Sequence, residues 1–225
     1  MSDVSANFNS QGFAVVPRLI DSASMRTLSQ QLDLVPTSAG SRLLLRLAWC
    51  QDLAVRLRSA LAKRQLLPPD AVAVQCTLFD KGPSKNWLVS LHQDRSIPVR
   101  SKVEGHGLTG WSEKEGDIFV QPPVSVLEQL TAVRLHIDDC PAESGALRVV
   151  PGSHLDGILS QAQSDASRAT QGELVVPASE ADALLMKPLV LHASSKATSG
   201  ARRRVLHFVY GPRDLPFGLE WQHAI

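Results

Sequence analysis

Residues 131–154 read TAVRLHIDDCPAESGALRVVPGSH. In the first part Val133, Leu135 and Ile137 alternate with polar residues, as in a β-strand that buries one face. The segment DDCP and the pair SG follow, and both are typical of turns. A second apolar run, ALRVV, then leads to the turn residues PGS. The stretch therefore predicts two strands that are separated and ended by turns, as in an all-β domain.

Similar short apolar runs lie on both sides of this stretch, from Pro69 onward. They are VAVQCTLF, WLVSLH, DIFVQ, ELVV, PLVLH and RVLHFVY, divided by Gly, Pro and Asp. Several short strands with turn signals between them predict an antiparallel sandwich or barrel. The stretches 95–117 and 155–172 show neither pattern, so we expect long irregular loops there, which are typically lids, binding loops or mobile segments.

The first third of the chain has a helical periodicity instead. In 21–35 the apolar residues fall at steps of three and four, and Asp21 or Ser22 can cap such a helix. The stretch 43–64 has the same pattern and stops at a Pro-Pro pair. We therefore expect a single domain over residues 1–225, with a helical preface over about 1–70 and a β core over about 71–212.

The composition is that of an ordinary globular protein. Hydrophobic residues make up 44% and charged residues 20% of the chain, close to the average values. Lys and Arg number 23 against 22 Asp and Glu, so the net charge of +1 gives nucleic acid no broad basic surface to bind. The three cysteines are scattered, which argues against a disulfide framework or a thiolate zinc site.

The chain also lacks the patterns of secretion and membrane insertion. Its start, MSDVSANFNS, does not have the form of a signal peptide, and no window is apolar enough for a spanning helix. We expect a cytoplasmic protein that has a small-molecule substrate and neither nucleic acid nor membrane as a partner. The oligomeric state stays open.

Three of the seven histidines begin a His-x-Asp triplet, at 92–94, 136–138 and 154–156. Side chains two residues apart on a strand point to the same side, so the imidazole and carboxylate of a triplet can reach one ion. A third ligand from a distant strand would complete the two-His, one-carboxylate face of non-haem Fe(II) oxygenases. His92 ends a predicted strand at the mouth of a long loop, which favours His92 and Asp94. His136 in mid-strand and His154 after a turn are better explained by structural roles.

A further histidine and an arginine triplet lie near the end of the chain. His192 follows the apolar run PLVL, where a structural histidine is more common than a ligand. Arg202, Arg203 and Arg204 open the run RVLHFVY, and such a triplet is usually a solvated charge run. Alternate residues of a strand face opposite sides, so one of these arginines can point into a barrel.

Taken together, SLHQD, LHIDDCPAESGALRVVPGSH and PLVLHASS followed by arginine resemble the phytanoyl-CoA dioxygenase family of Fe(II)/2-oxoglutarate oxygenases, over roughly residues 72–210. The family pattern is His-x-Asp, a Gly-containing turn before Pro-Gly-Ser-His, a distal histidine and an arginine about eleven residues later. His92, Asp94, His192 and Arg203 match this order. The resemblance implies a mainly β fold, with a double-stranded β-helix (jelly-roll, cupin-like) core flanked by N-terminal α-helices, and Fe(II) bound by His92, Asp94 and His192.

The resemblance also implies the cosubstrate 2-oxoglutarate, which binds iron through its 1-carboxylate and 2-oxo group. Its remote carboxylate then pairs with Arg203, whose planar guanidinium can bind it with two hydrogen bonds. Arg202 or Arg204 takes this role if the strand register differs by one residue. Ser194 can add a hydroxyl contact or cap the chain turn.

Three more residues are candidates for the same cavity. Arg134 stands where family members often have an aromatic residue, and it can contact 2-oxoglutarate, contact a substrate anion or pair with Asp138. Gln75 and Thr77 share one face of their strand. They can contact 2-oxoglutarate or simply form a hydrogen-bonded part of the wall.

We therefore expect a dioxygenase that uses O2 to hydroxylate a small-molecule metabolite and releases succinate and CO2. The presence of Asp94 favours hydroxylation over halogenation, because halogenases of this type leave that position free for halide. One alternative is a catalytically inactive small-molecule binding module on the same scaffold. A cupin-type metal isomerase or hydrolase is another, although the His-x-His clusters expected of it are absent.

Trp87, His106 and Trp111 flank or occupy 95–117 and can form a lid.

Overall fold

The large sheet forms one wall of the molecule and contains three of the predicted strands, VAVQCTLF, TAVRLHID and RVLHFVY. The computed structural model describes residues 2–35 and 40–225. Six strands form the large sheet: β1 (Phe13–Val16), β2 (Gly40–Ser41), β3 (Val72–Lys81), β8 (Thr131–His136), β11 (Ala183–Met186) and β13 (Arg203–Gly211). Their order across the sheet is β1-β11-β8-β13-β3-β2. All neighbours are antiparallel, as the sequence predicts.

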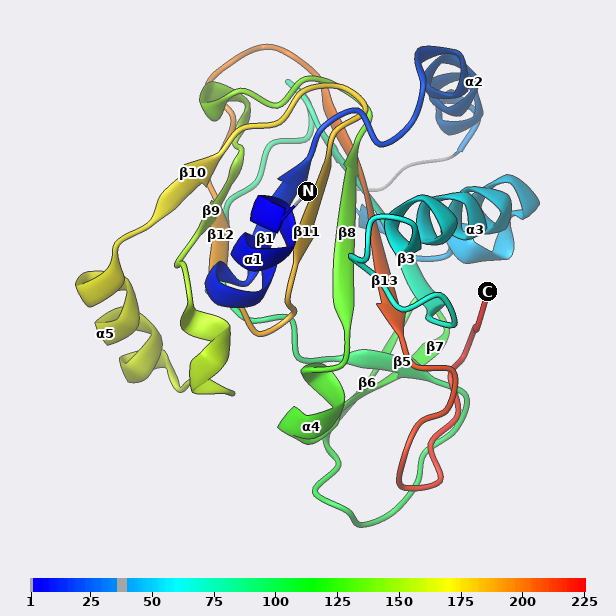
Figure 1. Cartoon of the computed structure of the whole chain (residues 1–225), viewed down its shortest axis with the longest axis vertical. Helices are drawn as coiled ribbons and strands as arrows, with labels where there is room; N and C mark the ends of the chain where they lie inside the picture. The colour runs from blue at the N-terminus through cyan, green and yellow to red at the C-terminus, as the bar shows by residue number, and fades with distance from the viewer. Residues whose placement is uncertain (1, 36–39) are drawn as a thin grey trace.

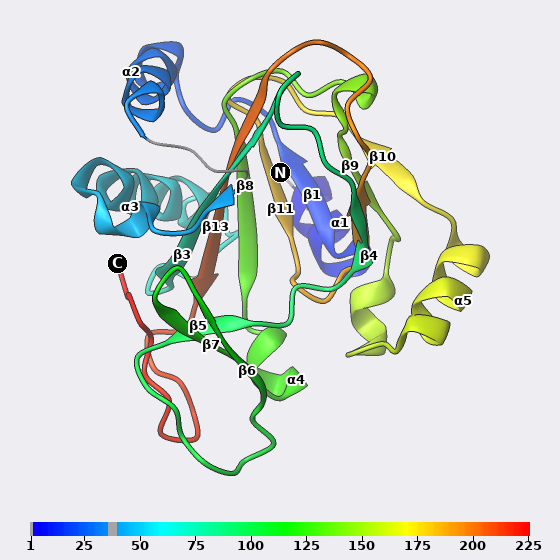
Figure 2. The same cartoon turned by 180° about the vertical axis from the view of Figure 1, so that it is seen from behind.

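A smaller antiparallel sheet lies opposite the large one (Figures 1 and 2). It contains β4 (Val89–His92), β9 (Leu147–Val149), β10 (Leu174–Val176) and β12 (His192–Ser194), in the order β10-β9-β12-β4. The two facing sheets form a jelly-roll core, which confirms the predicted mainly β fold class. Side chains from both sheets point into the space between them because successive residues of a strand alternate in direction.

A third sheet occupies the stretch for which we expected an irregular loop. Residues 95–117 contain β5 (Ile97–Val99) and β6 (Thr109–Lys114), and both pair with β7 (Asp117–Gln121). The prediction of a long loop is therefore wrong here. Gly105, Gly107 and Gly116 lie at turns, and Gly110 lies in β6 where the register shifts; all four have positive φ, a conformation that glycine adopts without strain. This sheet closes one end of the barrel, beside α4 (Val124–Leu127) (Figure 1).

The helices lie outside the two facing sheets. They are α1 (Ser2–Gln11), α2 (Ser22–Asp33), α3 (Ala48–Ala62) and α5 (Gln161–Gln171), with 3-10 turns η1 (Leu44–Arg46), η2 (Ala142–Ser144) and η3 (Ser153–Asp156). The predicted helix at 21–35 is confirmed as α2, and Asp21 caps it by accepting a hydrogen bond from the backbone N–H of Ser24 at 2.9 Å. The predicted helix at 43–64 is divided into η1 and α3.

Two predictions about regular structure fail outside the core. The helical preface contains β1 and β2, and β1 is an edge strand of the large sheet. The expected loop 155–172 contains α5, which begins with a capping box between Ser160 and Gln163. The three cysteines are buried and free, as expected.

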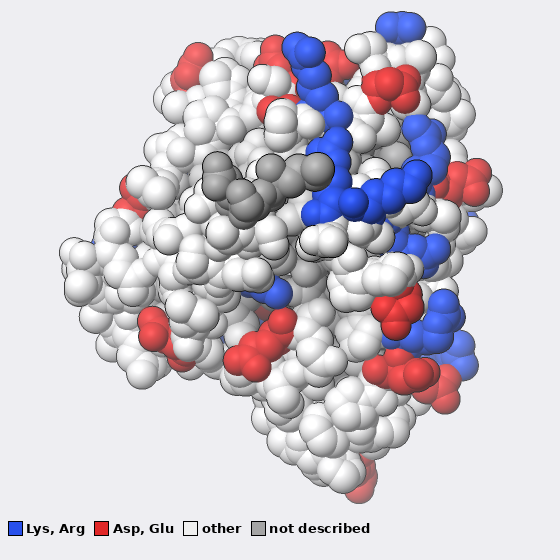
Figure 3. Space-filling view, viewed as in Figure 1, with Lys and Arg blue, Asp and Glu red and all other residues white. Residues whose placement is uncertain are grey.

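The surface carries both signs of charge on the face drawn in Figure 3. Basic side chains gather on the right of this view, over α2 and α3, and acidic side chains lie among them. Within residues 2–35 and 40–225, no helix has both the length and the apolar character that a membrane crossing requires.

Candidate active site

A cavity of about 350 Å³ lies between the two facing sheets. Its wall on the large sheet follows from strand register. Thr77, Arg134 and His207 form one row across β3, β13 and β8, and cross-strand partners point to the same side. All three residues line the cavity. Gln75, Phe79, Lys81 and Arg203 extend this wall at alternate positions of the same strands.

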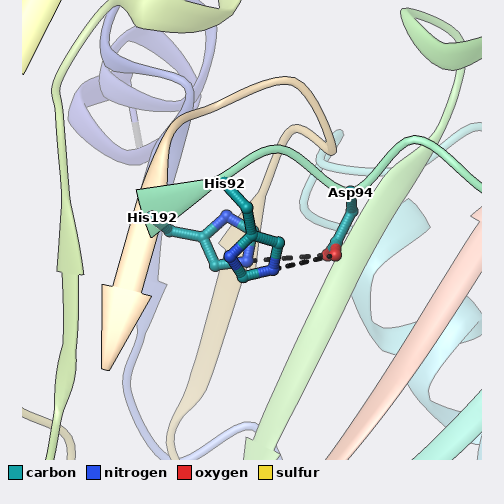
Figure 4. Close-up of side chains that lie close together, drawn as sticks. All are labelled: His92, Asp94 and His192. Carbon is teal, nitrogen blue, oxygen red and sulfur yellow. Dashed lines mark ion pairs between the residues drawn. The ribbon is translucent and has the colours of Figure 1, made fainter. Parts of the chain in front are cut away.

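The smaller sheet brings the predicted metal ligands together at the same cavity. His92 ends β4 and His192 begins β12, and the two residues are direct partners in the antiparallel pair. Asp94 lies two residues beyond the end of β4. Figure 4 shows the three side chains pointing toward one another. Each offers a ligand atom, and these atoms lie within 4.8 Å of one another.

Backbone carbonyls orient both imidazoles toward Asp94. The Nδ1 atom of His92 lies 2.8 Å from the carbonyl of Ser90, and Nδ1 of His192 lies 3.0 Å from the carbonyl of Val190. A carbonyl oxygen only accepts, so Nδ1 carries the hydrogen in each ring and Nε2 has a free lone pair. Each Nε2 faces Asp94, at 3.6 Å and 3.8 Å from its carboxylate oxygens. This is the orientation that metal-binding histidines adopt.

Burial and charge act on the protonation states of this group. Burial lowers the pKa of His192 to about 4. Burial opposes the charge of Asp94 as well, but the neighbouring histidines, His192 foremost, hold the pKa of its carboxyl well below its usual range. Burial also opposes protonation of His92, but the negative charge of Asp94 beside it raises the pKa of this imidazole. The carboxylate is therefore ionised and His192 neutral near pH 7, the states in which both groups bind a metal.

Arg203 lies farther along the cavity, at the end of β13. It is 2% exposed, and its Nη1 donates to the carbonyl of Gly145 at 3.2 Å. Ser194 donates its hydroxyl hydrogen to the same carbonyl at 3.0 Å. Gly145 follows η2 with φ +72°, and an added Cβ would lie 2.6 Å from the carbonyl oxygen of Ser195. The Gly-containing turn of the sequence pattern therefore forms this end of the cavity.

The two neighbouring arginines point away from the cavity and have carboxylate partners. Arg202 pairs with Asp80 and Asp33. Arg204 pairs with Asp33 and donates from its backbone and side chain to Asp138. Of the three, Arg203 alone lines the cavity, so the register that the sequence favoured is the one found.

The pairing of Arg134 with Asp138, one of the three roles considered for Arg134, is wrong. Asp138 lies beyond the end of β8, and its carboxylate is bound by Arg204. Arg134 instead donates from Nη1 to Nδ1 of His207 at 3.0 Å. Burial lowers the pKa of Arg134 to about 10 and the pKa of His207 to about 3. Near pH 7 Arg134 is a buried cation and His207 a neutral acceptor.

Some of the remaining candidate residues line the cavity and others do not. Gln75 and Thr77 line the cavity, and Gln75 donates to the Thr77 hydroxyl at 3.0 Å. Of the three residues proposed for a lid, Trp87 lines the cavity, whereas His106 stacks on Phe217 and Trp111 packs against a separate apolar cluster.

The two other histidine triplets do not reach the cavity. His136 is buried, and His154 lies beside α1, with its Nε2 atom 3.1 Å from the carbonyl of Asn9. Neither lines the cavity, and among the described residues Nδ1 of each ring is buried without a hydrogen-bond partner.

Sequence reasoning missed several side chains of the cavity wall, among them Lys81 and His207. Lys81 ends the same strand as Gln75 and Thr77, and extending their alternation to residues 79 and 81 would have found it. His207 shares the inward face of β13 with Arg203, and its Nε2 lies 3.8 Å from Asp94. Its pattern was visible in RVLHFVY, but its distance from the metal ligands is a property of the folded barrel.

Comparison with known proteins identifies the family. The sequence matches "Phytanoyl-CoA dioxygenase (PhyH)" over residues 8–205. The chain belongs to the phytanoyl-CoA dioxygenase family. The match begins well before residue 72, so the phytanoyl-CoA dioxygenase region includes most of the N-terminal helices and β1. A comparison with curated protein sequences finds no match.

Solved structures share the fold at low sequence identity. The epimerase SnoN, in complex with Fe3+, alpha ketoglutarate and nogalamycin RO, has a TM-score of 0.71 and 14% identity, covering 99% of this chain and 93% of SnoN. The carbocyclase SnoK from nogalamycin biosynthesis has a TM-score of 0.68 and 15% identity, covering 95% and 85%. HygX from Streptomyces hygroscopicus, with nickel and 2-oxoglutarate bound, has a TM-score of 0.65 and 18% identity, covering 94% and 87%. These similarities show a common fold with proteins of the phytanoyl-CoA dioxygenase type.

Proposed function

We propose that the protein is a non-haem Fe(II)- and 2-oxoglutarate-dependent dioxygenase that hydroxylates a small-molecule metabolite. The observation that carries the proposal is the convergence of His92, Asp94 and His192, with both histidines held in the metal-binding tautomer. Two imidazoles and one carboxylate form the ligand set of non-haem Fe(II) oxygenases, which leaves positions open for cosubstrate and O2. The solved structures of SnoN with Fe3+ and alpha ketoglutarate, and of HygX with nickel and 2-oxoglutarate, support the same cofactors.

The donor set fits this cofactor pair. The Nε2 atoms of His92 and His192 and one oxygen of Asp94 would hold the iron. Arg203 would bind the remote carboxylate of 2-oxoglutarate. Ser194 lies in the wall beside Arg203, and Arg134, Gln75 and Thr77 lie on the wall between Arg203 and the metal ligands. Among the described residues that line the cavity, Asp94 is the only carboxylate, so a dicarboxylate meets little repulsion there.

The chemistry divides between cofactor and protein. When bound, the iron supplies the activation of O2 that couples the decarboxylation of 2-oxoglutarate, to succinate and CO2, with oxidation of the substrate. The chain holds the metal ligands in the neutral (histidine) or anionic (aspartate) state and orients 2-oxoglutarate through the buried cations of the cavity. The two facing sheets hold the substrate between them. One atom of O2 enters succinate and the other enters the hydroxylated product.

The test is succinate formation from 2-oxoglutarate by the Fe(II)-loaded protein, measured with a panel of metabolites in the presence and absence of O2. We expect one class of metabolite to stimulate succinate release, with a product one oxygen atom heavier. His92→Ala, Asp94→Ala and His192→Ala should lose this activity, whereas His154→Ala should keep it because His154 lies outside the cavity.

The alternatives give different results in the same assay. An inactive binding module would bind metabolites without releasing succinate, and a metal isomerase or hydrolase would act without O2. Because the fold is shared with an epimerase and a carbocyclase, the mass of the product must be measured to tell hydroxylation from these other reactions. An epimerised product keeps the mass of the substrate and a cyclised product loses two hydrogen atoms, so either result would replace hydroxylation while retaining 2-oxoglutarate chemistry.

A further inference from the structure

We propose that Lys81 binds the remote carboxylate of 2-oxoglutarate together with Arg203, and that this pair makes the cavity selective for 2-oxo dicarboxylates. The inference rests on the proposed function and extends it to a residue of β3 that the family pattern does not include. It is carried by two buried cations that lie side by side in the cavity wall and have no carboxylate partner within residues 2–35 and 40–225.

The register of the large sheet brings the two cations together. Lys81 and Arg203 are direct partners in the antiparallel pair of β3 and β13, so their side chains leave the sheet on the same side, with Cβ atoms about 5 Å apart. Both line the cavity, and they are 1% and 2% exposed. Two like charges are therefore held close together away from water.

The contacts of this pair are hydrogen bonds to uncharged groups. Lys81 donates from Nζ to the Ser194 hydroxyl at 2.7 Å and to the carbonyl of Ser195 at 2.8 Å. Arg203 donates to the carbonyl of Gly145, and its Nε is buried without a partner. In the described part of the chain neither cation has a carboxylate within ion-pair distance. Arg202 and Arg204, by contrast, both have such partners.

A buried pair of cations without a counterion is costly, and a bound anion removes that cost. The ammonium group has three hydrogens, and its hydrogen bonds to Ser194 and Ser195 leave one for a ligand. Ser194 accepts from Lys81 while it donates to Gly145, so its single hydrogen is already used. We assign Ser194 the positioning of Lys81, and Lys81 the second contact with the carboxylate.

The charge state of Lys81 provides an independent signal. Burial lowers its pKa to about 8, and repulsion from Arg203 and Arg134 acts in the same direction, while Cys140 opposes it weakly. The ring of Trp87 lies 5.2 Å from the ammonium nitrogen and adds no charge. A carboxylate bound beside Lys81 stabilises the protonated form. Binding of a dicarboxylate near pH 8 should therefore take up a proton, since part of the Lys81 population is neutral before binding.

The experiment compares two ligands on the protein loaded with Ni(II), which substitutes for Fe(II) without oxygen chemistry. The ligands are 2-oxoglutarate and 2-oxopentanoate, which has the same five-carbon chain and 2-oxo acid group but lacks the remote carboxylate. Titration calorimetry should show that Lys81→Met weakens 2-oxoglutarate binding by about 10- to 100-fold and leaves 2-oxopentanoate binding unchanged. Lys81→Arg should retain most of the affinity, and Lys196→Met, an exposed change of the same kind, should have no effect.

A second measurement uses the unmodified protein and so does not depend on the folding of a variant. Calorimetry at pH 8 in buffers of different ionisation enthalpy should detect proton uptake with 2-oxoglutarate and less with 2-oxopentanoate. Because both ligands bind the metal in the same way, the difference reports on the remote carboxylate.

The outcomes separate this inference from the proposed function. If 2-oxoglutarate binds, but folded Lys81→Met binds it with unchanged affinity or the two ligands take up equal numbers of protons, the role of Lys81 is overturned. If the Ni(II)-loaded protein binds neither 2-oxo acid, the proposed function itself fails.

Discussion

Arg134 donates a hydrogen bond from Nη1 to Nδ1 of His207 over 3.0 Å. A guanidinium has no acceptor atom, so Nδ1 of His207 must be unprotonated and its hydrogen must lie on Nε2. That Nε2 faces Asp94 Oδ2 at 3.8 Å. Arg134 therefore fixes the tautomer of a histidine that presents an N–H to the carboxylate of the metal site.

This relationship predicts that His207 supports metal binding from outside the ligand set. His207→Phe keeps a ring but removes the N–H, and we expect it to weaken Fe(II) binding by about tenfold or more, as is typical when the partner of a metal ligand is lost. His207→Gln, which retains an N–H donor, should bind Fe(II) more tightly than the phenylalanine variant. Anaerobic metal titration measures both. Equal affinity in His207→Phe and the unmodified protein would contradict the role.

Arg203 and Arg204 offer a matched pair of arginines on opposite faces of β13. A lysine at 203 cannot form two parallel hydrogen bonds to a carboxylate, so Arg203→Lys should raise the 2-oxoglutarate concentration needed for half-maximal succinate formation by about 10- to 100-fold. Arg204→Lys loses contacts with Asp138 on the outer face and should lower the melting temperature without this kinetic effect. A 2-oxoglutarate defect confined to Arg204→Lys would place the anchor on the other face.

The turn at Gly145 should be sensitive to a single methyl group. Gly145→Ala adds the strain of a positive φ and a close contact with the carbonyl of Ser195, so we expect it to lower the free energy of unfolding by at least about 2 kcal/mol. Gly116 also has a positive φ, but an added Cβ there meets no atom of the described residues within 4 Å. Gly116→Ala should therefore cost about 1 kcal/mol. Urea denaturation of both variants separates the close contact from the backbone strain.

His136 should make the fold less stable in acid. Burial, with repulsion from Arg134 and Arg203, lowers its pKa to about 4, below the value of about 6.5 expected when unfolded. The unfolded chain therefore binds the proton more readily, and the stability that His136 contributes is present above pH 6.5 and is lost as the pH falls toward 4. Between pH 7 and pH 5 this amounts to about 2 kcal/mol. Urea denaturation should show a smaller loss over this range in His136→Gln, and an equal loss would exclude His136 as the source.

The core strands were predictable because their sequences alternate and are bounded by turn residues. β3, β8 and β13 are long enough for this pattern, and their register then brings Arg134, His207 and Thr77 into one row. β1 and β11 were missed because their sequences, FAVV and ALLM, are short apolar runs, for which periodicity does not separate a strand from a buried helical turn. The strands in 95–117 were missed for a related reason, since glycines at turns hide the short strands between them.

The metal site was predictable to a greater degree than its surroundings. His92, Asp94 and His192 were predicted from the order of several motifs, and this order can be read from the sequence without knowledge of the fold. The partner of Asp138 and the position of Lys81 depend instead on which strand ends meet across the barrel. Arg204 lies 66 residues from Asp138 and Ser194 lies 113 residues from Lys81, so no local pattern could have paired them.

The position of β1 at the edge of the large sheet has a consequence for how the chain folds. Phe13 pairs with Met186 and Val16 with Ala183, so β1 and its partner strand are far apart in the sequence and β1 is synthesised first. Contacts of such large sequence separation form slowly because a long loop must close first. During translation the FAVV segment remains unpaired until β11 has emerged from the ribosome. An exposed apolar strand is a site for aggregation, and α1, whose contacts with β1 are local in sequence, is placed to cover it during this interval.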